Sequence, residues 1–183
     1  MRTSGRTRAT SRGQEQQRDR PAAAAIDAGF NDSIASMLIS TANVWRRSGN
    51  AYYRRLFGVS ITEVAILSLL DTHAPLTLNA IADHVGIDKT QMSRSVKDLV
   101  ERKLVRQRTS PRHGSELEIA LDKEGQRLCK RLKPAAAARL QMLLASLTPQ
   151  QIALIEDLLK NLRRNARTTL LSENSSRPSK QAR

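Results

Sequence analysis

Apolar residues recur at intervals of three and four along most of this chain, and that spacing predicts a mostly helical protein. Two long apolar stripes, over 34–56 and 152–162, indicate helices near the two ends. Between them the pattern is divided at Gly58, Pro75 and Gly86, which are residue types that end helices. The predicted helices cover 27–57, 62–72, 77–84, 89–102, 122–147 and 149 to about 170.

Capping residues support several of these helix starts. Thr62, Thr77 and Asp88 are the predicted N-caps of the second, third and fourth helices, because their side-chain oxygens can accept hydrogen bonds from first-turn N–H groups. Residues 148–151 (TPQQ) form a capping box with proline at the first helical position. Pro134 lies inside the fifth helix and is expected to kink or restart it.

The two segments 104–108 and 116–121 alternate weakly and flank the turn-rich sequence SPRHGS, so they predict a β-hairpin. Three short helices followed by a hairpin make a winged helix-turn-helix. The long outer helices exceed what this unit needs, and a second copy of the chain is the economical cover for their apolar stripes. The predicted fold is mostly α with a small β-hairpin wing and with long N- and C-terminal dimerisation helices.

The ends of the chain differ in composition from its middle. Residues 1–20 carry six arginines against Glu15 and Asp19 and hold almost no apolar residues, which predicts a disordered basic arm. An organellar transit peptide is an alternative, whereas a secretory signal is excluded because no hydrophobic stretch follows. The predicted organisation is an arm (1–25), one regulator domain (26–170) and a flexible polar tail (171–183). Within the domain, 61–121 is the DNA-binding winged helix, and 26–57 and 122–170 are dimerisation helices.

The charge of the chain narrows the class of partner. There are 31 Lys and Arg against 17 Asp and Glu among 183 residues, a formal net charge of +14. This balance indicates a polyanionic partner, double-stranded DNA first and an anionic membrane second. No apolar run approaches the ~20 residues of a membrane span, so no membrane partner is predicted. The single cysteine favours a reducing compartment, and the predicted location is the cytoplasm.

The fourth helix has the pattern of a recognition helix. Met92, Val96 and Leu99 lie on one side, and polar residues lie on the other. Glutamine and arginine can contact bases bidentately, and the N-terminal half of such a helix is the part that reaches base edges. Eight basic residues against two acidic ones over 89–112 favour DNA contact over a plain solvated face. The predicted DNA-contacting residues are Thr77, Lys89, Thr90, Gln91, Ser93, Arg94, Lys97, Arg106, Arg108 and Arg112.

The run from about residue 57 to residue 125 resembles the MarR-type transcriptional regulators. The specific part is 76–108, which has a third helix of small residues, then Gly-Ile-Asp-Lys-Thr, then Ser93-Arg94 and a hydrophobic close at Leu104-Val105. The resemblance implies a homodimeric winged-helix regulator that binds a palindromic operator and often responds to small aromatic or phenolic ligands. It also implies a repressor that such a ligand releases.

The wing departs from the pattern of this family. Where the family commonly carries an Asp-Gly-Arg-Arg-like run, residues 113–116 are His-Gly-Ser-Glu. The arginine of the family that enters the minor groove therefore has no direct counterpart. Either Arg112 replaces it, or the arginine-rich arm supplies minor-groove contacts.

The aromatic residues of the first long helix permit two interpretations. Trp45, Arg46, Tyr52 and Tyr53 either pack in the core or dimer interface, or line an effector pocket in which an aromatic ring would stack and arginine would hold a carboxylate. The resemblance to MarR-type regulators is the reason for naming these four residues as candidate ligand contacts.

Other chemistry has little support in the sequence. The chain carries no phosphate-binding glycine loop, nucleophile elbow or paired-carboxylate motif, so no enzyme and no cofactor is predicted. His73, His84 and His113 are far apart in sequence, so no metal site is expected. Two alternatives to a sequence-specific regulator remain: a sequence-tolerant architectural DNA-binding protein, and a redox-sensing regulator whose Cys129 is exposed beside basic residues.

Overall fold

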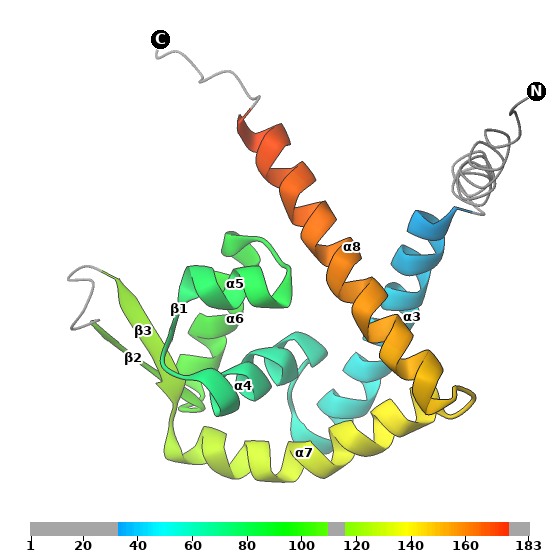
Figure 1. The fold of residues 1–183 in the computed structure, drawn as a ribbon. Helices are drawn as coiled ribbons and strands as arrows, with labels where there is room; N and C mark the ends of the chain where they lie inside the picture. Colours follow the sequence, from blue (N-terminus) through cyan, green and yellow to red (C-terminus); the bar gives the residue numbers. More distant parts are fainter. Residues whose placement is uncertain (1–32, 110–115, 176–183) are drawn as a thin grey trace, which may run out of the picture. The chain divides into compact units, whose positions relative to one another are not determined.

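The computed structural model describes residues 33–109 and 116–175 (Figure 1). The chain divides into two compact units, one ending at Cys129 and the other beginning at Lys130. The described residues form six helices and a small antiparallel sheet, which confirms the predicted mostly helical winged helix. The predicted arm 1–25, the hairpin loop 110–115 and most of the predicted tail lie outside the described residues.

The first unit begins with two helices joined by a short turn. Helix α3 (Ile34–Phe57) starts after Ser33 and ends at Gly58, whose φ of 69° is left-handed. The predicted residues 27–32 lie outside the description. Helix α4 (Ile61–His73) is capped by Ser60, so the predicted cap Thr62 is wrong. The reason is a capping box: the Ser60 hydroxyl accepts from the Glu63 amide at 3.2 Å, and the Glu63 carboxylate accepts from the Ser60 amide at 2.5 Å.

The helix-turn-helix consists of α5 (Leu78–Val85) and α6 (Lys89–Glu101). Both predicted caps are confirmed: the Thr77 hydroxyl accepts from the Ala80 amide at 3.3 Å, and the Asp88 carboxylate accepts from the Gln91 amide at 2.9 Å. The tight turn between the helices requires Gly86, which has a φ of 78°.

The sheet contains one more strand than the predicted hairpin. Strands β2 (Val105–Thr109) and β3 (Leu117–Leu121) form the hairpin, and β1 (Leu76–Thr77) pairs with the other edge of β3. All pairs are antiparallel, with Leu76 opposite Ile119 and Gln107 also opposite Ile119. A strand of two residues shows no alternation of polar and apolar positions, so β1 could not be predicted from the pattern.

The core of the first unit lies among α4, α5, α6 and the sheet. The predicted inner face of α6 is confirmed, because Met92, Val96 and Leu99 are at most 1% exposed. Full burial of such a side chain stabilises the fold by about 1.5–3 kcal/mol. The other fully buried large side chains of this unit are Val59, Ile66, Leu67, Leu70, Ile81, Val105 and Ile119.

Two long helices complete the described chain. Helix α7 (Lys123–Leu144) continues through Pro134, so the predicted restart of the helix there is wrong. Residues 135–138 are all alanine, the strongest helix former, which offsets the amide that proline lacks. Helix α8 (Pro149–Ser175) starts with the predicted capping box: the Gln151 side chain accepts from the Thr148 amide at 2.8 Å, and the Thr148 hydroxyl accepts from the Gln151 amide at 3.3 Å.

In the described ranges no single helix is long and apolar enough to cross a membrane. By length and composition alone, α3 and α4 pass that test only as a pair, and the pair is bent by 74°. Much of α4 is buried within the winged helix, as expected of a core helix.

An arginine cluster joins three helices of the first unit. Arg102 follows α6 directly, and its Nη1 donates to Glu63 Oε1 at 2.6 Å and to Asp98 Oδ2 at 3.0 Å. Its Nη2 donates to the Gly58 carbonyl at 3.0 Å. The hydrogen bond from the Arg102 guanidinium holds the pKa of Asp98 below its usual value, because it stabilises the ionised carboxylate.

We expect Asp98→Asn to lower stability near neutral pH and to have less effect in acid. A carboxylate whose folded pKa is lowered contributes stability above its unfolded pKa of about 3.9, and the contribution disappears as the pH falls through the folded pKa. The Asp98 side chain is 56% exposed, so solvent screening limits the loss to about 1 kcal/mol or less. Urea unfolding of both proteins between about pH 7 and pH 3.5 measures it. A difference in midpoint that stays constant down to the lowest pH contradicts the assignment, and 1 M salt should reduce it.

Candidate nucleic-acid interface

The outer face of α6 is polar and exposed. Its N-terminal half presents Thr90, Gln91, Ser93 and Arg94, the residues predicted to contact bases. All four are exposed, because the helix turns its apolar side into the core. Hydroxyl, amide and guanidinium groups on one accessible helix face can donate to or accept from base edges in a major groove.

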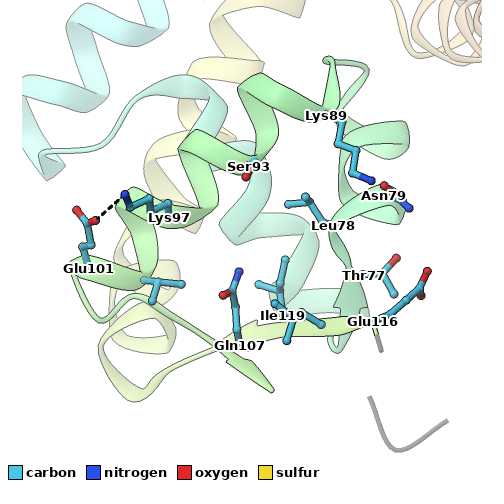
Figure 2. Close-up of a pocket in the computed structure, with 12 residues that line it drawn as sticks. Thr77, Leu78, Asn79, Lys89, Ser93, Lys97, Glu101, Gln107, Glu116 and Ile119 are labelled. Carbon is cyan, nitrogen blue, oxygen red and sulfur yellow. Dashed lines mark ion pairs between the residues drawn. The ribbon is translucent and has the colours of Figure 1, made fainter. Parts of the chain in front are cut away.

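A groove of about 650 Å³ runs between α6 and the sheet (Figure 2). At one of its ends lie Lys89, Asn79 and Thr77, and at the other Lys97 forms an ion pair with Glu101 at 3.9 Å. The remaining lining residues are Leu78, Ser93, Val100, Gln107, Glu116, Leu117 and Ile119. The lining of the groove is thus partly apolar, and it also contains basic and acidic side chains.

The sheet register separates the residues of β2. Gln107 stands opposite Ile119, and both line the groove beside α6. Because successive strand residues point to opposite faces, the predicted contacts Arg106 and Arg108 lie on the other face, where Arg108 stands opposite Glu118. Arg106 and Arg108 are exposed, but they do not share a surface with the groove side of the recognition helix.

Two further polar residues of this region were not among the predicted contacts. Asn79 is exposed at the start of α5 and lines the groove, and Gln107 lines it from the sheet. Strand alternation was the signal that would have selected Gln107 over its arginine neighbours. The hydroxyl of Thr77, a predicted DNA contact, accepts from the Ala80 amide and so caps α5.

Not all of the eight basic residues over 89–112 are available to a polyanion. Arg102 is held by Glu63 and Asp98, with only 34% of its side chain exposed. Lys97 pairs with Glu101, although both side chains are well exposed and such a pair exchanges readily with solvent or another anion. Arg112 lies outside the described residues. The exposed basic residues that remain are Lys89, Arg94, Lys103, Arg106 and Arg108.

The candidate ligand contacts all lie on α3. Trp45 and Tyr52 are half-buried and share one side of the helix at a spacing of seven residues. Tyr53 is buried at 4% exposure, with its ring centroid 5.2 Å from that of Tyr52 and 6.3 Å from that of Phe57. Arg46 is exposed and donates to Asn43 Oδ1 at 2.9 Å. None of these four residues lines the groove beside α6.

The structure also bears on Cys129. The thiol is 3% exposed, and its Sγ lies 3.6 Å from the Leu67 carbonyl in α4. The redox alternative required an exposed thiolate, and this burial does not meet that condition.

Two of the three histidines lie close together in space. The rings of His73 and His84 lie with their centroids 6.1 Å apart, so these two are close in space although distant in sequence. His113 lies outside the described residues. Within the described part of the chain, no group of three or more His, Cys, Asp or Glu side chains is placed to hold a metal ion.

The winged helix and its outer helices match known proteins. Residues 57–114 match the sequence model of the MarR family. The MarR/EmrR family transcriptional regulator from Acinetobacter sp. ADP1 is 27% identical, with a TM-score of 0.69 over 73% of this chain and 94% of that one. No curated protein matches the sequence.

Two more distant structures share the fold. CouR from Rhodococcus jostii RHA1, bound to p-coumaroyl-CoA, is 21% identical, with a TM-score of 0.66 over 75% of this chain and 96% of that one. MepR from S. aureus, in complex with DNA, is 16% identical, with a TM-score of 0.65 over 73% of this chain and 98% of that one. The predicted resemblance is confirmed: residues 57–114 match the MarR family model, and the fold is similar to that of a MarR/EmrR family transcriptional regulator.

Proposed function

We propose that this regulator binds a palindromic DNA site as a homodimer in the cytoplasm and represses transcription until a small aromatic or phenolic ligand releases it. The observation that carries the DNA-binding part is the division of α6 into a buried apolar face and an exposed polar face. MepR, which has a similar fold, was solved on DNA. Gln91 and Arg94 are the strongest candidates for base contacts, since both can bond a base bidentately.

Phosphate contacts would surround this face. Lys89 at the N-terminus of α6 combines a positive charge with the partial positive charge of the helix end. Lys97 can exchange its exposed partner Glu101 for a phosphate. On the wing, Arg106 and Arg108 would contact a backbone segment different from the one beside the groove, because they lie on the far face of the sheet. The proposed surface also includes Ser93, Thr90 and Thr77, and Arg112, which lies outside the described residues, is a further candidate.

Replacing Gln91 and Arg94 separately by alanine tests this assignment. The probe is the duplex that the unaltered chain selects from a random-sequence pool, compared with a shuffled duplex of equal length. We expect Gln91→Ala to weaken the selected duplex by ~1–3 kcal/mol and to leave the shuffled duplex and the salt dependence unchanged. If Arg94 contacts only phosphate, Arg94→Ala should weaken both duplexes and reduce the salt slope by about one. Gln126→Ala is a control that removes an exposed neutral amide from α7, away from the proposed surface.

Two results would contradict the proposal. Equal losses on both duplexes for Gln91→Ala would remove that residue from the base contacts. Failure of the unaltered chain to prefer any duplex by about 10³ over bulk DNA would favour the sequence-tolerant architectural alternative.

The homodimer is supported by apolar side chains that remain exposed on the outer helices. On α8, Leu154, Leu158, Leu159 and Leu162 are 42–59% exposed, and Ile155 is 36% exposed. On α3, Ile34, Met37, Leu38, Ile39 and Val44 are 40–58% exposed. Contiguous exposed apolar surface on a folded chain marks an association site, and a palindrome requires two recognition helices about one DNA turn apart.

The double change Leu159→Glu and Leu162→Glu should give a monomer that has lost its affinity for the selected duplex. Two charges on an apolar interface would each have to be desolvated without a partner. A matched control is Ala153→Glu with Lys160→Gln, which changes the charge by the same amount on the opposite side of α8. Sedimentation at micromolar concentration measures the outcome. A monomeric unaltered chain, or a double variant that remains dimeric, would refute this arrangement.

The proposal of a releasing ligand is supported by the aromatic side of α3 and by the similar structure of CouR, which was solved bound to p-coumaroyl-CoA. Trp45 and Tyr52 offer half-buried rings to an aromatic ligand, and the exposed Arg46 offers a guanidinium to its carboxylate. Tyr53 would act by packing, since its ring is in the core. A ligand releases DNA only if it prefers the form of the dimer that does not fit DNA.

Titration with benzoates, cinnamates and their thioesters, with and without the selected duplex, tests this part. Trp45 is the only tryptophan, so its emission reports binding near α3. We expect a ligand to weaken DNA binding about 5–150-fold, and DNA to weaken ligand binding by the same factor. Arg46→Gln should weaken carboxylate ligands only, with Arg47→Gln on the next position as control. If no compound changes either Trp45 emission or DNA affinity, aromatic release is excluded for this panel.

A further inference from the structure

We propose that Arg102 is a positioning residue for DNA binding, which fixes the recognition helix to the joint between α3 and α4. The inference rests on the proposed function, because it assigns Arg102 to the alignment of the DNA-contacting face and not to DNA contact itself. Arg102 is one of the eight basic residues over 89–112 that favoured DNA contact in the sequence, and the proposal assigns it a different role.

Three elements meet at the Arg102 guanidinium. Asp98 belongs to α6, Glu63 to the first turn of α4, and the Gly58 carbonyl to the residue that ends α3. Glu63 and Gly58 are 39 and 44 residues from Arg102 in sequence, so these bonds are tertiary. One side chain therefore joins the end of the recognition helix to the ends of two other helices.

Glu63 anchors this cluster to the backbone. Its Oε2 accepts from the Ser60 amide at 2.5 Å, and its Oε1 accepts from Arg102 at 2.6 Å. The residue is 7% exposed, the only charged residue in the buried set of the described chain. A buried carboxylate without its cation is costly, by several kcal/mol in known cases, so the pair persists as a unit.

The joint to which Arg102 is bound is itself tight. Asn50 Oδ1, on α3, accepts from the Ile61 amide of α4 at 2.9 Å. A Cβ on Gly49 would collide with the Ile61 side chain, so α3 and α4 approach closely at this point. The end of α3 and the start of α4 are thus held together, and Arg102 connects α6 to both.

The chemistry requires arginine. The guanidinium directs two nitrogens to acceptors on different elements, and its planar fork fixes their relative directions. The ammonium of a lysine is one point charge and cannot span the Glu63 carboxylate and the Gly58 carbonyl in this way. Two carboxylates lie beside Arg102 and offset its charge, although a third of the side chain remains exposed.

Because Arg102 lies at one end of α6, a small rotation there displaces the other end of the helix. Arg102 is at the C-terminal end of α6, whereas Gln91 and Arg94 lie near the other end, about 12–17 Å away at 1.5 Å per residue. A rotation of about 5° at the link would displace the far end by ~1–1.5 Å, enough to misalign a bidentate contact with a base. A shift of α3, on which Trp45 and Tyr52 lie, would reach α6 by the same route.

The variants Arg102→Gln and Arg102→Lys test the role on DNA, and Lys123→Gln is a control that removes one exposed positive charge at the start of α7. We expect both Arg102 variants to weaken the selected duplex by about tenfold or more, with the shuffled duplex and the salt slope unchanged. Rescue by Arg102→Lys, or a salt slope reduced by about one in Arg102→Gln, would make Arg102 a phosphate contact and overturn the proposal. Unchanged affinity in both variants would overturn it as well.

Amide hydrogen exchange of the full chain without DNA tests the link separately from the proposed function. Arg102→Gln should speed exchange in peptides over 54–60 and over 98–104 together, because both helix ends lose one shared bond. Asp98→Asn removes only the partner on α6 and should leave 54–60 unchanged. If 54–60 is also unchanged in Arg102→Gln, the link is refuted, even where no duplex is selected and the proposed function fails.

A second variant covers the case in which Arg102→Gln does not fold. Glu63→Gln keeps the size of the side chain and an oxygen for the Ser60 amide while removing the charge that faces Arg102. It should reproduce the loss on the selected duplex and the faster exchange over 98–104. When combined with Arg102→Lys, its effect on affinity should be less than additive, because both changes break one interaction. Full additivity would overturn the proposal.

Discussion

Burial of Met92, Val96 and Leu99 against the core decides which side of the recognition helix faces outward. These three side chains are buried where α6 packs against α4, α5 and the sheet. A helix with three buried side chains on one face can present only its opposite face to a partner. The polar groups on the outer face of α6 therefore lie at the surface as a consequence of packing.

The end of the same helix shows that a basic side chain can be bonded within the fold and so be less available to a polyanion. Arg102 is as basic as Arg94, yet its guanidinium donates to Glu63, Asp98 and the Gly58 carbonyl. A charge that is neutralised within the fold contributes little to the attraction of phosphates, since its field is cancelled nearby. The basic surface of this regulator is thus smaller than its net charge suggests, and one of its arginines serves alignment.

The outer helices make a different contribution from the winged helix. The winged helix buries most of its apolar side chains, whereas α3 and α8 each leave a row of apolar side chains exposed. Such exposure is costly for a monomer in water and favours association with matching apolar surface. The aromatic residues of α3 lie on the helix whose end Arg102 connects to α6, so the candidate ligand region and the polar face of α6 belong to connected helices.

The sequence by itself determined the features that depend on neighbours within about four residues. The inner face of α6, the caps Thr77 and Asp88 and the capping box before α8 all follow from helical periodicity and first-turn hydrogen bonds. The MarR-type winged helix was predictable for the same reason, because its elements are short and their signals are local. Where two local signals competed, as at Ser60 and Thr62, the glutamate three residues after Ser60 decided the helix start.

Only the tertiary structure decided the features that join distant segments. The Arg102 cluster spans 39 to 44 residues, β1 pairs with a strand about 40 residues later, and His73 meets His84 across a loop and a helix. The register of β2 and β3 placed Gln107, and not its arginine neighbours, beside the recognition helix. Such contacts arise from packing and strand register, and a one-dimensional pattern of residue types does not encode which distant partners will meet.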